Sequence, residues 1–265
     1  MAETDNLKDG AAPSSQTLDR AVAALRIVAG ARNAGVTLAE VAQKVGLTKP
    51  TVRRLLLALM ENGLIEQDPA SRSYFCGPET YALGILAGER FGVHRMAGDS
   101  LRRLADRSGD AALLSVQRGN ETVCLAREEG TYPLRSHVLQ PGDRHPLGCG
   151  ASGIALLAAL PDAQVEVILR HNQERLLGAY PHLSIPLIRE QVRQARLLGY
   201  AFNQGLVFKG SWGVAVVVAD PRGGLPASLA IAGVESRFAD NRHEALVALL
   251  NQEKAIVEAR MRGGH

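Results

Sequence analysis

The sequence predicts an α+β chain in two parts. Residues 17–77 are expected to form a winged helix-turn-helix, residues 78–92 a linker helix, and residues 93–265 a larger domain in which helices flank an antiparallel sheet. Three observations predict this organisation: two short amphipathic segments separated by a turn containing Gly46, a hairpin pattern directly after them, and paired strand-like runs in the second half. Residues 1–16, rich in Ala, Asp, Ser and Gly, are predicted to be a flexible tail.

Composition narrows the class of protein. Of the 265 residues, 46% are hydrophobic and 22% charged, which is typical of a globular chain. No apolar run approaches the ~20 residues of a membrane span, and the polar N-terminus does not resemble a secretory signal. The three cysteines, Cys76, Cys124 and Cys149, are scattered without a CxxC pair. We therefore expect a cytoplasmic protein without a membrane segment or a structural metal site.

The first two helices are predicted from apolar spacing and from end signals. From Thr17 onward, apolar residues recur at helical spacing: Leu18, Ala21, Val22, Leu25 and Val28. Thr37 and Glu40 form a T-x-x-E capping box before a second helix, which Gly46 ends. The predicted buried stripe of that helix is Leu38, Val41, Ala42 and Val45.

A third helix and a wing complete the predicted small domain. Thr48 is the expected cap and Pro50 lies in the first turn, where a missing N–H costs nothing. Gly63 is expected to end the helix, whose inward face is Val52, Leu55, Leu56 and Leu59. Two strand-like runs on either side of the turn at 69–72 then predict a hairpin, and a helix-turn-helix followed by a hairpin is a winged helix. The alternative is a generic three-helix bundle with a hairpin.

The linker helix is unusually apolar. Tyr81, Leu83, Ile85 and Leu86 are too hydrophobic for a lone exposed helix, so we expect them to pack in a dimer interface or against the first helix. A looser stretch at 88–92 separates this helix from the next, which carries Leu101, Leu104 and Ala105.

The second half alternates strand and helix patterns. Strands are predicted at 112–118 and 121–128, joined by Gly119-Asn120, and a third around 133–138. Helices are predicted at 150–160, 163–171, 185–198 and 242–260, and strands within 200–208, 212–220 and 226–234, with a turn at 220–224. The final helix carries Ala245, Leu246, Leu249, Leu250 and Ile256. Strands in hairpins with helices on one side predict an α+β sheet.

The order of these motifs resembles the IclR family of bacterial regulators. The resemblance is carried by TLDRAVAALRIV, TLAEVAQKVGLTKPTVRRLLLALMENGLIEQD and HPLGCGASGIALLAAL, and it runs from about Thr17 to the C-terminus. It implies a winged-helix DNA-binding domain, a dimerising linker helix and a sensor-like α/β effector-binding domain. We therefore expect a ligand-responsive, sequence-specific transcriptional regulator that is not an enzyme. It is expected to bind a pseudo-palindromic double-stranded DNA operator as a homodimer or homotetramer.

The DNA contacts are predicted from charge placement. Residues 1–88 hold nine Lys/Arg and nine Asp/Glu, yet 48–57 carries three basic residues and no acid. Recognition helices present their N-terminal residues to base edges while neighbouring groups hold phosphates. The candidate DNA-binding residues are Thr37, Thr48, Lys49, Thr51, Arg53, Arg54 and Arg72.

These residues have different expected roles. Lys49 and Arg53 can reach guanine O6/N7, and Thr51 a base or a thymine methyl. By analogy with the family, Arg54 is expected at a phosphate; Thr37 is a second phosphate candidate at a helix N-terminus. Arg72 at the wing tip is expected in the minor groove or at the backbone. The alternative is that these charges are simply solvated.

The effector site is predicted from a glycine turn and from the resemblance. Residues 148–153 spell G-x-G-x-x-G, but no apolar strand leads into them and no βαβ unit follows, so no nucleotide cofactor is expected. The resemblance makes Gly150 and Ala151 backbone donors to the effector. Family members that bind small oxoacids place an Asp, a Cys and two Ser at the positions of Asn203, Gly213, Ala230 and Ala232.

A pocket lined by such small residues is roomier and less polar, which favours a larger, partly aromatic organic acid. Trp212, next to Gly213, is expected to line the pocket or its mouth, or to pack in the core.

Two other functions compete with this interpretation. Cys149, four residues after His145, is the candidate nucleophile of a thiol-dependent enzyme on a sensor-type fold. The same two residues fall short of the four ligands of a structural metal site. A third possibility is a DNA-bound scaffold whose C-terminal domain only oligomerises.

Overall fold

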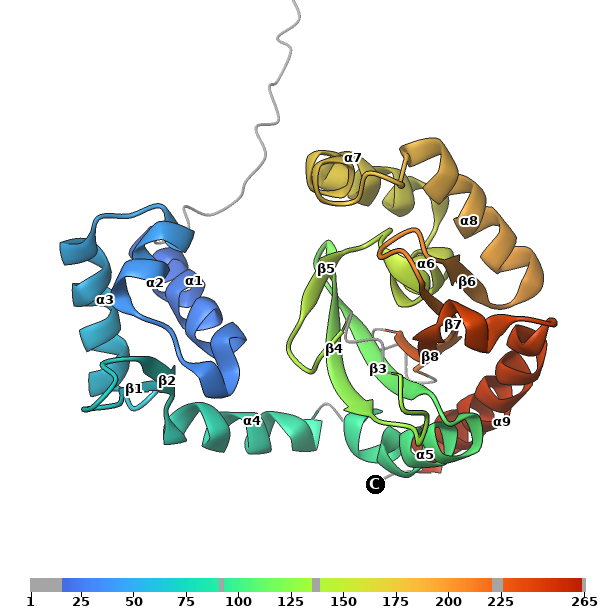
Figure 1. Cartoon of the computed structure of the whole chain (residues 1–265), viewed down its shortest axis with the longest axis horizontal. Helices are drawn as coiled ribbons and strands as arrows, with labels where there is room; N and C mark the ends of the chain where they lie inside the picture. Colours follow the sequence, from blue (N-terminus) through green and yellow to red (C-terminus); the bar gives the residue numbers. More distant parts are fainter. Residues whose placement is uncertain (1–15, 91–92, 135–138, 221–225, 264–265) are drawn as a thin grey trace, which may run out of the picture. The chain divides into compact units, whose positions relative to one another are not determined.

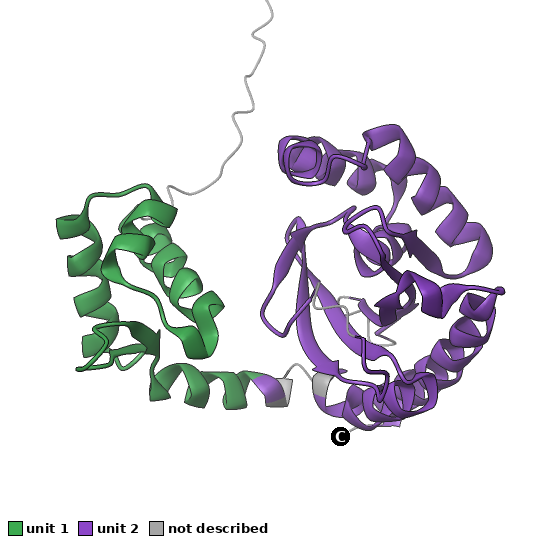
Figure 2. Ribbon diagram, in the orientation of Figure 1, with its two compact units in different colours: residues 1–87 green, residues 88–265 purple. Residues whose placement is uncertain are grey.

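The structure is a computed structural model that describes residues 16–90, 93–134, 139–220 and 226–263 (Figure 1). The chain divides into two compact units, residues 1–87 and residues 88–265 (Figure 2). The predicted tail, 1–16, lies outside the described residues except for Gln16, with which the first helix begins.

The first unit is a winged helix-turn-helix. Its elements are α1 (Gln16–Ala31), a 3-10 turn (Arg32–Ala34), α2 (Leu38–Val45), α3 (Lys49–Glu61) and the antiparallel strands β1 (Ile65–Gln67) and β2 (Tyr74–Cys76). Their apolar faces enclose one core: Ala24, Val28, Val36, Val41, Ala42, Val52, Leu56, Leu59, Ile65 and Tyr74. The fold predicted for this part of the chain is confirmed.

Local signals set the ends of α2 and α3. The backbone N–H of Thr37 donates to Glu40 Oε2 at 2.8 Å, and the N–H of Glu40 donates to Thr37 Oγ1 at 3.3 Å, which is the predicted capping box. Gly46 takes the left-handed conformation (φ 72°) that ends α2. Thr48 is the N-cap residue of α3, as expected, but its hydroxyl bonds to Thr51 Oγ1 at 3.0 Å and not to a backbone N–H of the first turn.

Two consecutive helices, α4 (Pro78–Arg90) and α5 (Val93–Ser108), follow the wing. The apolar side chains of α4 are solvent-exposed within the chain, 73% for Tyr81 and 64% for Leu86. The expectation that they pack against the first helix is therefore wrong.

The second unit is built on a six-stranded antiparallel sheet in the order β5-β4-β3-β8-β7-β6. The strands are β3 (Ala111–Arg118), β4 (Glu121–Glu128), β5 (Arg144–Pro146), β6 (Ala201–Gln204), β7 (Ser211–Val218) and β8 (Ala227–Val234). The strand expected around 133–138 is wrong for Pro133 and Leu134, which form a bend, and 135–138 lie outside the described residues. The edge strand beside β4 is β5, in which His145 is paired with Thr122 of β4.

Helices cover both faces of this sheet, so the expectation of helices on one side is wrong (Figure 1). α5 and α9 (Arg242–Gly263) lie against one face; α6 (Gly150–Ala158), α7 (Asp162–Ala179) and α8 (Ile185–Leu198) lie against the other. The reason is that alternate strand residues are apolar in both directions: Leu114 and Val214 join one core, whereas Leu113 and Ala215 join the other.

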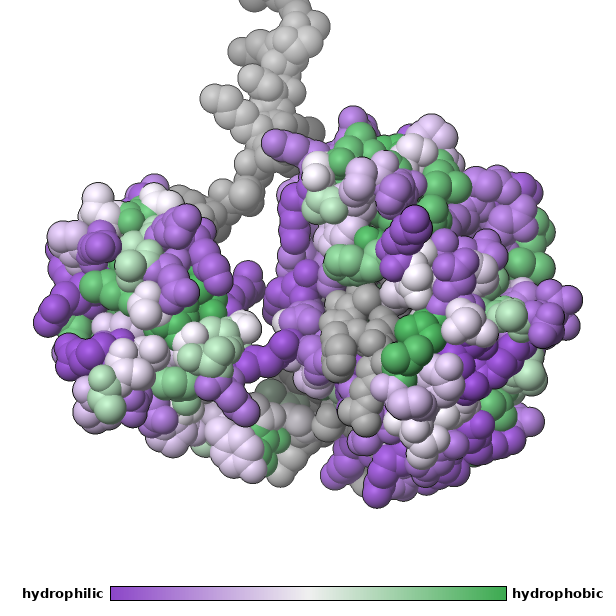
Figure 3. Space-filling model, in the orientation of Figure 1, coloured by the Kyte–Doolittle hydropathy of each residue, from purple (hydrophilic) through white to green (hydrophobic). Residues whose placement is uncertain are grey.

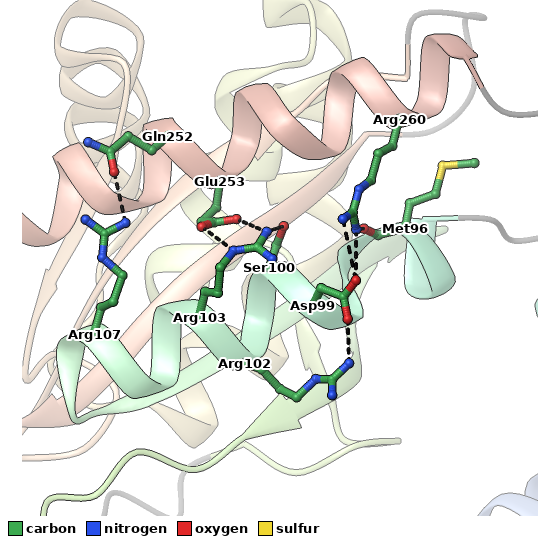
Figure 4. Close-up of polar contacts among 9 residues, drawn as sticks. All are labelled: Met96, Asp99, Ser100, Arg102, Arg103, Arg107, Gln252, Glu253 and Arg260. Atoms are coloured by element: carbon green, nitrogen blue, oxygen red, sulfur yellow. Dashed lines mark hydrogen bonds and ion pairs between the residues drawn. The ribbon is translucent and has the colours of Figure 1, made fainter.

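Helix α9 differs from its predicted pattern. Its buried residues are Leu246, Leu250, Glu253, Val257 and Met261, whereas Ile256 is exposed. The buried Glu253 is one of several polar residues that join α9 to α5 (Figure 4). Arg103 donates to both of its carboxylate oxygens, at 2.8 and 2.6 Å, and Arg107 donates to Gln252 at 3.0 Å. In the part of the chain that is described, no helix is long and apolar enough to cross a membrane.

Candidate functional sites

Helix α3 separates an apolar face from a basic one. Val52, Leu55, Leu56 and Leu59 are buried, as predicted. Lys49, Arg53 and Arg54 are exposed, and the spacing of four residues places Lys49 and Arg53 on the same side of the helix. Figure 3 shows mainly hydrophilic residues along the left margin of this unit, where α3 is drawn in Figure 1.

The two threonines at the start of α3 are less available than the basic residues. Thr48 is exposed and Thr51 is half-buried, and their hydroxyls are bonded to each other. The sequence interpretation missed Leu57, which is 44% exposed one turn after Arg53. The signal was present, since Leu57 does not fit the inward stripe of α3.

Of the candidate DNA-binding residues, Thr37 is the least available to a phosphate group. Its hydroxyl donates to Glu40 Oε2 at 2.7 Å, and its backbone N–H is bound by the same carboxylate. These bonds from the Thr37 backbone and hydroxyl hold the pKa of Glu40 below its usual range, so Glu40 is ionised. A phosphate at this helix end would meet a negative charge.

Arg72 lies at an ordered wing tip. It adopts a left-handed backbone (φ 61°), and its N–H donates to the carbonyl of Asp68 at 2.9 Å. The Asp68 side chain accepts the N–H of Ser71 at 2.6 Å, which closes the turn. Arg72 itself is exposed.

All seven candidate effector residues line one cavity of the second unit. This α6 cavity measures about 640 Å³, including the open space at its mouth. Its described lining consists of Leu113, Thr122, Arg127, Leu139, His145, Cys149, Gly150, Ala151, Ser152, Asn203, Val207, Ser211, Trp212, Gly213, Ala230, Ile231 and Ala232.

Strand register brings three of the candidates into one row. Asn203 on β6 is paired with Gly213 on β7, and Gly213 is paired with Ala232 on β8. Ala230, two residues before Ala232, is paired with Leu113 on β3. Residues from different strands thus form one wall of the cavity. We call it the low wall, because the side chains of Gly213, Ala230 and Ala232 are small and take up little of the cavity.

The opposite wall is the start of α6. Gly148 (φ 103°) and Gly150 (φ 70°) adopt left-handed conformations that most side chains avoid. The N-cap residue Cys149 gives no side-chain hydrogen bond to the first turn. The first N–H groups of a helix have no partner within it, so those of α6 remain available to a ligand oxygen.

Trp212 meets both expectations stated for it. The residue borders the α6 cavity, and it also packs against the core on the α5–α9 side. Its ring centroid lies 5.5 Å from that of Phe202 and 6.2 Å from that of Phe238.

Cys149 does not have the environment of a nucleophile. Burial raises the pKa of its thiol to about 12, whereas nucleophilic cysteines have a lowered pKa. The nearby His145 is 3.7 Å from Cys149 Sγ through Nδ1, but the same nitrogen lies 2.7 Å from the Tyr180 hydroxyl. Burial also lowers the pKa of His145, so this ring is neutral at pH 7. Among the described residues, no group of three or more His, Cys, Asp or Glu is placed to hold a metal ion.

Sequence interpretation missed several lining residues. Thr122 and Arg127 lie on β4, and Leu139 and Val207 in loops. The strand pattern placed Arg127 on a strand, but only the pairing of β4 with β3 shows that it faces the cavity.

Two family models match the chain. The model described as IclR helix-turn-helix domain matches residues 17–69, and the model described as Bacterial transcriptional regulator IclR C-terminal matches residues 87–257. The chain belongs to the IclR family. It is a transcriptional regulator with a DNA-binding helix-turn-helix domain and a ligand-binding C-terminal domain.

Similar proteins agree with this family over most of their length. The regulator SauR of Cupriavidus necator is 31% identical over 213 residues, 80% of this chain and 84% of SauR. An IclR-family crystal structure from Alicyclobacillus acidocaldarius has a TM-score of 0.77 and 25% identity, covering 92% of this chain and 97% of that one. An IclR homologue from Microbacterium hydrocarbonoxydans, crystallised with 4-hydroxybenzoate, has a TM-score of 0.75 and 21% identity, covering 94% and 100% of the two chains.

Proposed function

We propose that this IclR-family regulator senses a small organic acid with an aromatic or similarly flat body, which binds in the α6 cavity and changes operator affinity. The observation that carries the proposal is the low wall of Gly213, Ala230 and Ala232 opposite the open N-terminus of α6. Small side chains leave room for a ring, while free helix N–H groups bind a carboxylate oxygen.

A structural neighbour supports the ligand class. The Microbacterium hydrocarbonoxydans protein binds 4-hydroxybenzoate on the same fold. The effector-binding residues are proposed to be Gly150, Ala151, Asn203, Trp212, Gly213, Ala230 and Ala232.

On the DNA side, we propose that Lys49 and Arg53 read base edges. Arg54 and Arg72 then hold the backbone, with Thr48 and Thr51 shaping the start of α3 and Thr37 contributing least. The chain is proposed to bind a pseudo-palindromic operator as a homodimer, or as a pair of dimers, joined through α4.

We propose no catalytic role for the α6 cavity. The raised pKa of Cys149 removes the nucleophile on which the thiol-enzyme alternative depends. A regulator of bacterial operators acts where the chromosome is, so we place the protein in the cytoplasm.

The experiment measures the fluorescence of Trp212, the chain's single tryptophan. Emission is recorded while 4-hydroxybenzoate, benzoate, pyruvate and glyoxylate are added, and operator binding is measured with and without each compound. A saturable change with an aromatic acid, together with altered operator affinity, supports the proposal. A response to glyoxylate or pyruvate alone contradicts the ligand class, and absence of any response contradicts the site.

A further inference from the structure

Arg127 is a buried cation in the wall of the α6 cavity. It lies on β4 opposite Leu113 of β3, and both residues line the cavity. Its side chain is only 3% exposed to solvent. Among the described lining residues, Arg127 is the one that carries a permanent charge, because His145 is neutral and no carboxylate borders the cavity.

Glu129 is the acidic partner of this guanidinium. Arg127 Nε donates to Glu129 Oε1 at 2.7 Å, and Nη2 donates to Oε2 at 3.3 Å. Arg127 Nη1 donates to the carbonyl oxygen of Leu139 at 2.8 Å. The Glu129 side chain is 34% exposed, against 3% for Arg127, and it lines a separate small cavity beside Ala232.

Because of these two environments, Arg127 depends on the ion pair more than Glu129 does. A guanidinium with so little exposed surface depends on a counter-charge, whereas a partly exposed carboxylate is solvated by water in part. A ligand carboxylate offers a guanidinium the same two-oxygen geometry as Glu129. In the α6 cavity it would also meet the partial positive charge at the start of α6.

We propose that Arg127 selects anionic effectors, and that the effector carboxylate competes with Glu129 for it. This inference rests on the proposed function and adds a residue that sets the charge of the ligand. Two opposite effects are expected. Removal of the Arg127 cation should weaken the binding of an anionic ligand, and removal of the Glu129 carboxylate should strengthen it.

The test uses 4-hydroxybenzoate and 4-hydroxybenzamide, which have the same ring and nearly the same shape but differ in charge. Binding to the full-length protein is measured by calorimetry and by Trp212 emission. The natural protein should prefer the carboxylate by about tenfold or more, as expected for hydrogen bonds to a charged group. Arg127→Met should remove that preference while binding the amide as before, and Arg127→Lys should keep part of it.

Glu129→Gln is the matched second variant, because it keeps the shape of the side chain and leaves Arg127 in place. It should bind the carboxylate several-fold more tightly and the amide unchanged. Glu129→Gln also provides the test if Arg127→Met fails to fold, which thermal denaturation reports.

The outcomes separate this inference from the proposed function. An equal loss of both probes in Arg127→Met indicates a structural role and overturns the inference, as does weaker or unchanged carboxylate binding in Glu129→Gln. If the natural protein binds the probes and changes its operator affinity but shows no preference for the carboxylate, only the inference fails. If it binds neither probe, the proposed aromatic-acid effector is wrong, and the inference falls with it.

Discussion

At the scale of single residues, Gly213 controls how much space the α6 cavity offers. A Cβ at this position would lie 3.3 Å from the Ile231 carbonyl oxygen and 3.7 Å from Ala232 Cβ. Its backbone is in regular register with both neighbouring strands, so a side chain here has no need to disturb the sheet beyond a small local shift.

Gly213→Phe should therefore fill the cavity and abolish the response to an aromatic acid while operator binding remains. The measurements are Trp212 emission during ligand titration and a gel-shift assay on the same preparation. Gly213→Ala is the matched control and should keep most of the response. A normal ligand response in Gly213→Phe would place the effector site elsewhere.

The three cysteines differ in burial and thus in reactivity. Cys76 is exposed on the wing, whereas Cys124 and Cys149 are buried. With a pKa of about 12, the thiol of Cys149 stays protonated at pH 8 and reacts slowly with disulfide reagents.

Partial burial raises the pKa of the Cys76 thiol too, but Cys76 is the cysteine that a reagent can reach. The native protein should therefore show one thiol that reacts more rapidly than the others in a titration with an aromatic disulfide at pH 8, and three equivalent thiols in denaturant. Cys76→Ser should remove the rapid phase. Fast reaction of Cys149 in the native protein would instead restore the thiol-enzyme alternative.

At the scale of elements, α3 presents two neighbouring arginines with different proposed roles. Arg53 shares a helix side with Lys49, and Arg54 points about 100° away around the helix axis. A residue that reads bases affects some sequences more than others, whereas one that holds phosphate affects all sequences alike.

Arg53→Ala should cost roughly 1–3 kcal/mol on the cognate operator and relax one base position. Arg54→Ala should weaken binding uniformly and lower the salt dependence. Arg193→Ala on α8 removes the same charge from an exposed position in the other unit and should change neither. Unaltered sequence preference in Arg53→Ala would exclude it from base readout.

A second feature at this scale is the polar contact between α5 and α9 (Figure 4). The Glu253 side chain is 3% exposed, and both of its oxygens accept from Arg103. Burial alone would raise its pKa, but hydrogen bonds from Arg103 and Ser100 and the nearby positive charges outweigh burial, and the pKa is lowered.

A carboxyl group with a lowered folded-state pKa stabilises the fold above its unfolded pKa, and this contribution is lost as pH falls through the folded value. Glu253→Gln should therefore lower stability at pH 7 by roughly 1.5–3 kcal/mol, the usual range for hydrogen bonds to charged groups. The difference from the natural protein should shrink below about pH 4, where glutamate becomes protonated. Urea denaturation at several pH values measures this difference in the free energy of unfolding. Glu190→Gln, which breaks an exposed pair with Arg193, should leave stability unchanged; an equal effect of both substitutions would contradict this account.

At the scale of the whole molecule, α4 is the surface that points to self-association. Tyr81, Leu83, Ile85 and Leu86 are all exposed within one chain, around half or more of each side chain. Four such residues on one helix are an apolar surface that a monomer rarely leaves open. A dimer formed here gives the two helix-turn-helix units the two-fold symmetry that a palindromic operator requires.

Replacing Ile85 and Leu86 together with Glu should convert the proposed dimer to a monomer and weaken operator binding, because each unit would then bind its half-site separately. Light scattering during gel filtration gives the mass. Leu197→Glu on α8 changes an equally exposed leucine and should leave the mass unchanged. A dimer that persists in the α4 variant would show that the chains associate through another surface.

Local chemistry was sufficient for the elements whose signals lie within a few residues of one another. The Thr37–Glu40 capping box, Gly46 and the inward stripe of α3 defined the helix-turn-helix, and Gly119-Asn120 joined β3 to β4. Helix α8 begins and ends at its predicted residues, because Ser184 caps one end and Gly199 adopts the left-handed conformation at the other.

Contacts between distant segments decided the rest. Periodicity shows that a strand alternates, but not which helix covers which side, so the two-faced sheet and the burial of Glu253 on α9 were missed. The pairing of β3 with β8 joins residues about a hundred positions apart, and together with the pairing of β8 with β7 it builds the low wall of the α6 cavity. By itself, the sequence determined the two domains, the family and the small residues of that wall. Only the tertiary structure placed Arg127 in the wall of the α6 cavity, because the direction of a strand side chain depends on its pairing register and on the bulge between β3 and β4.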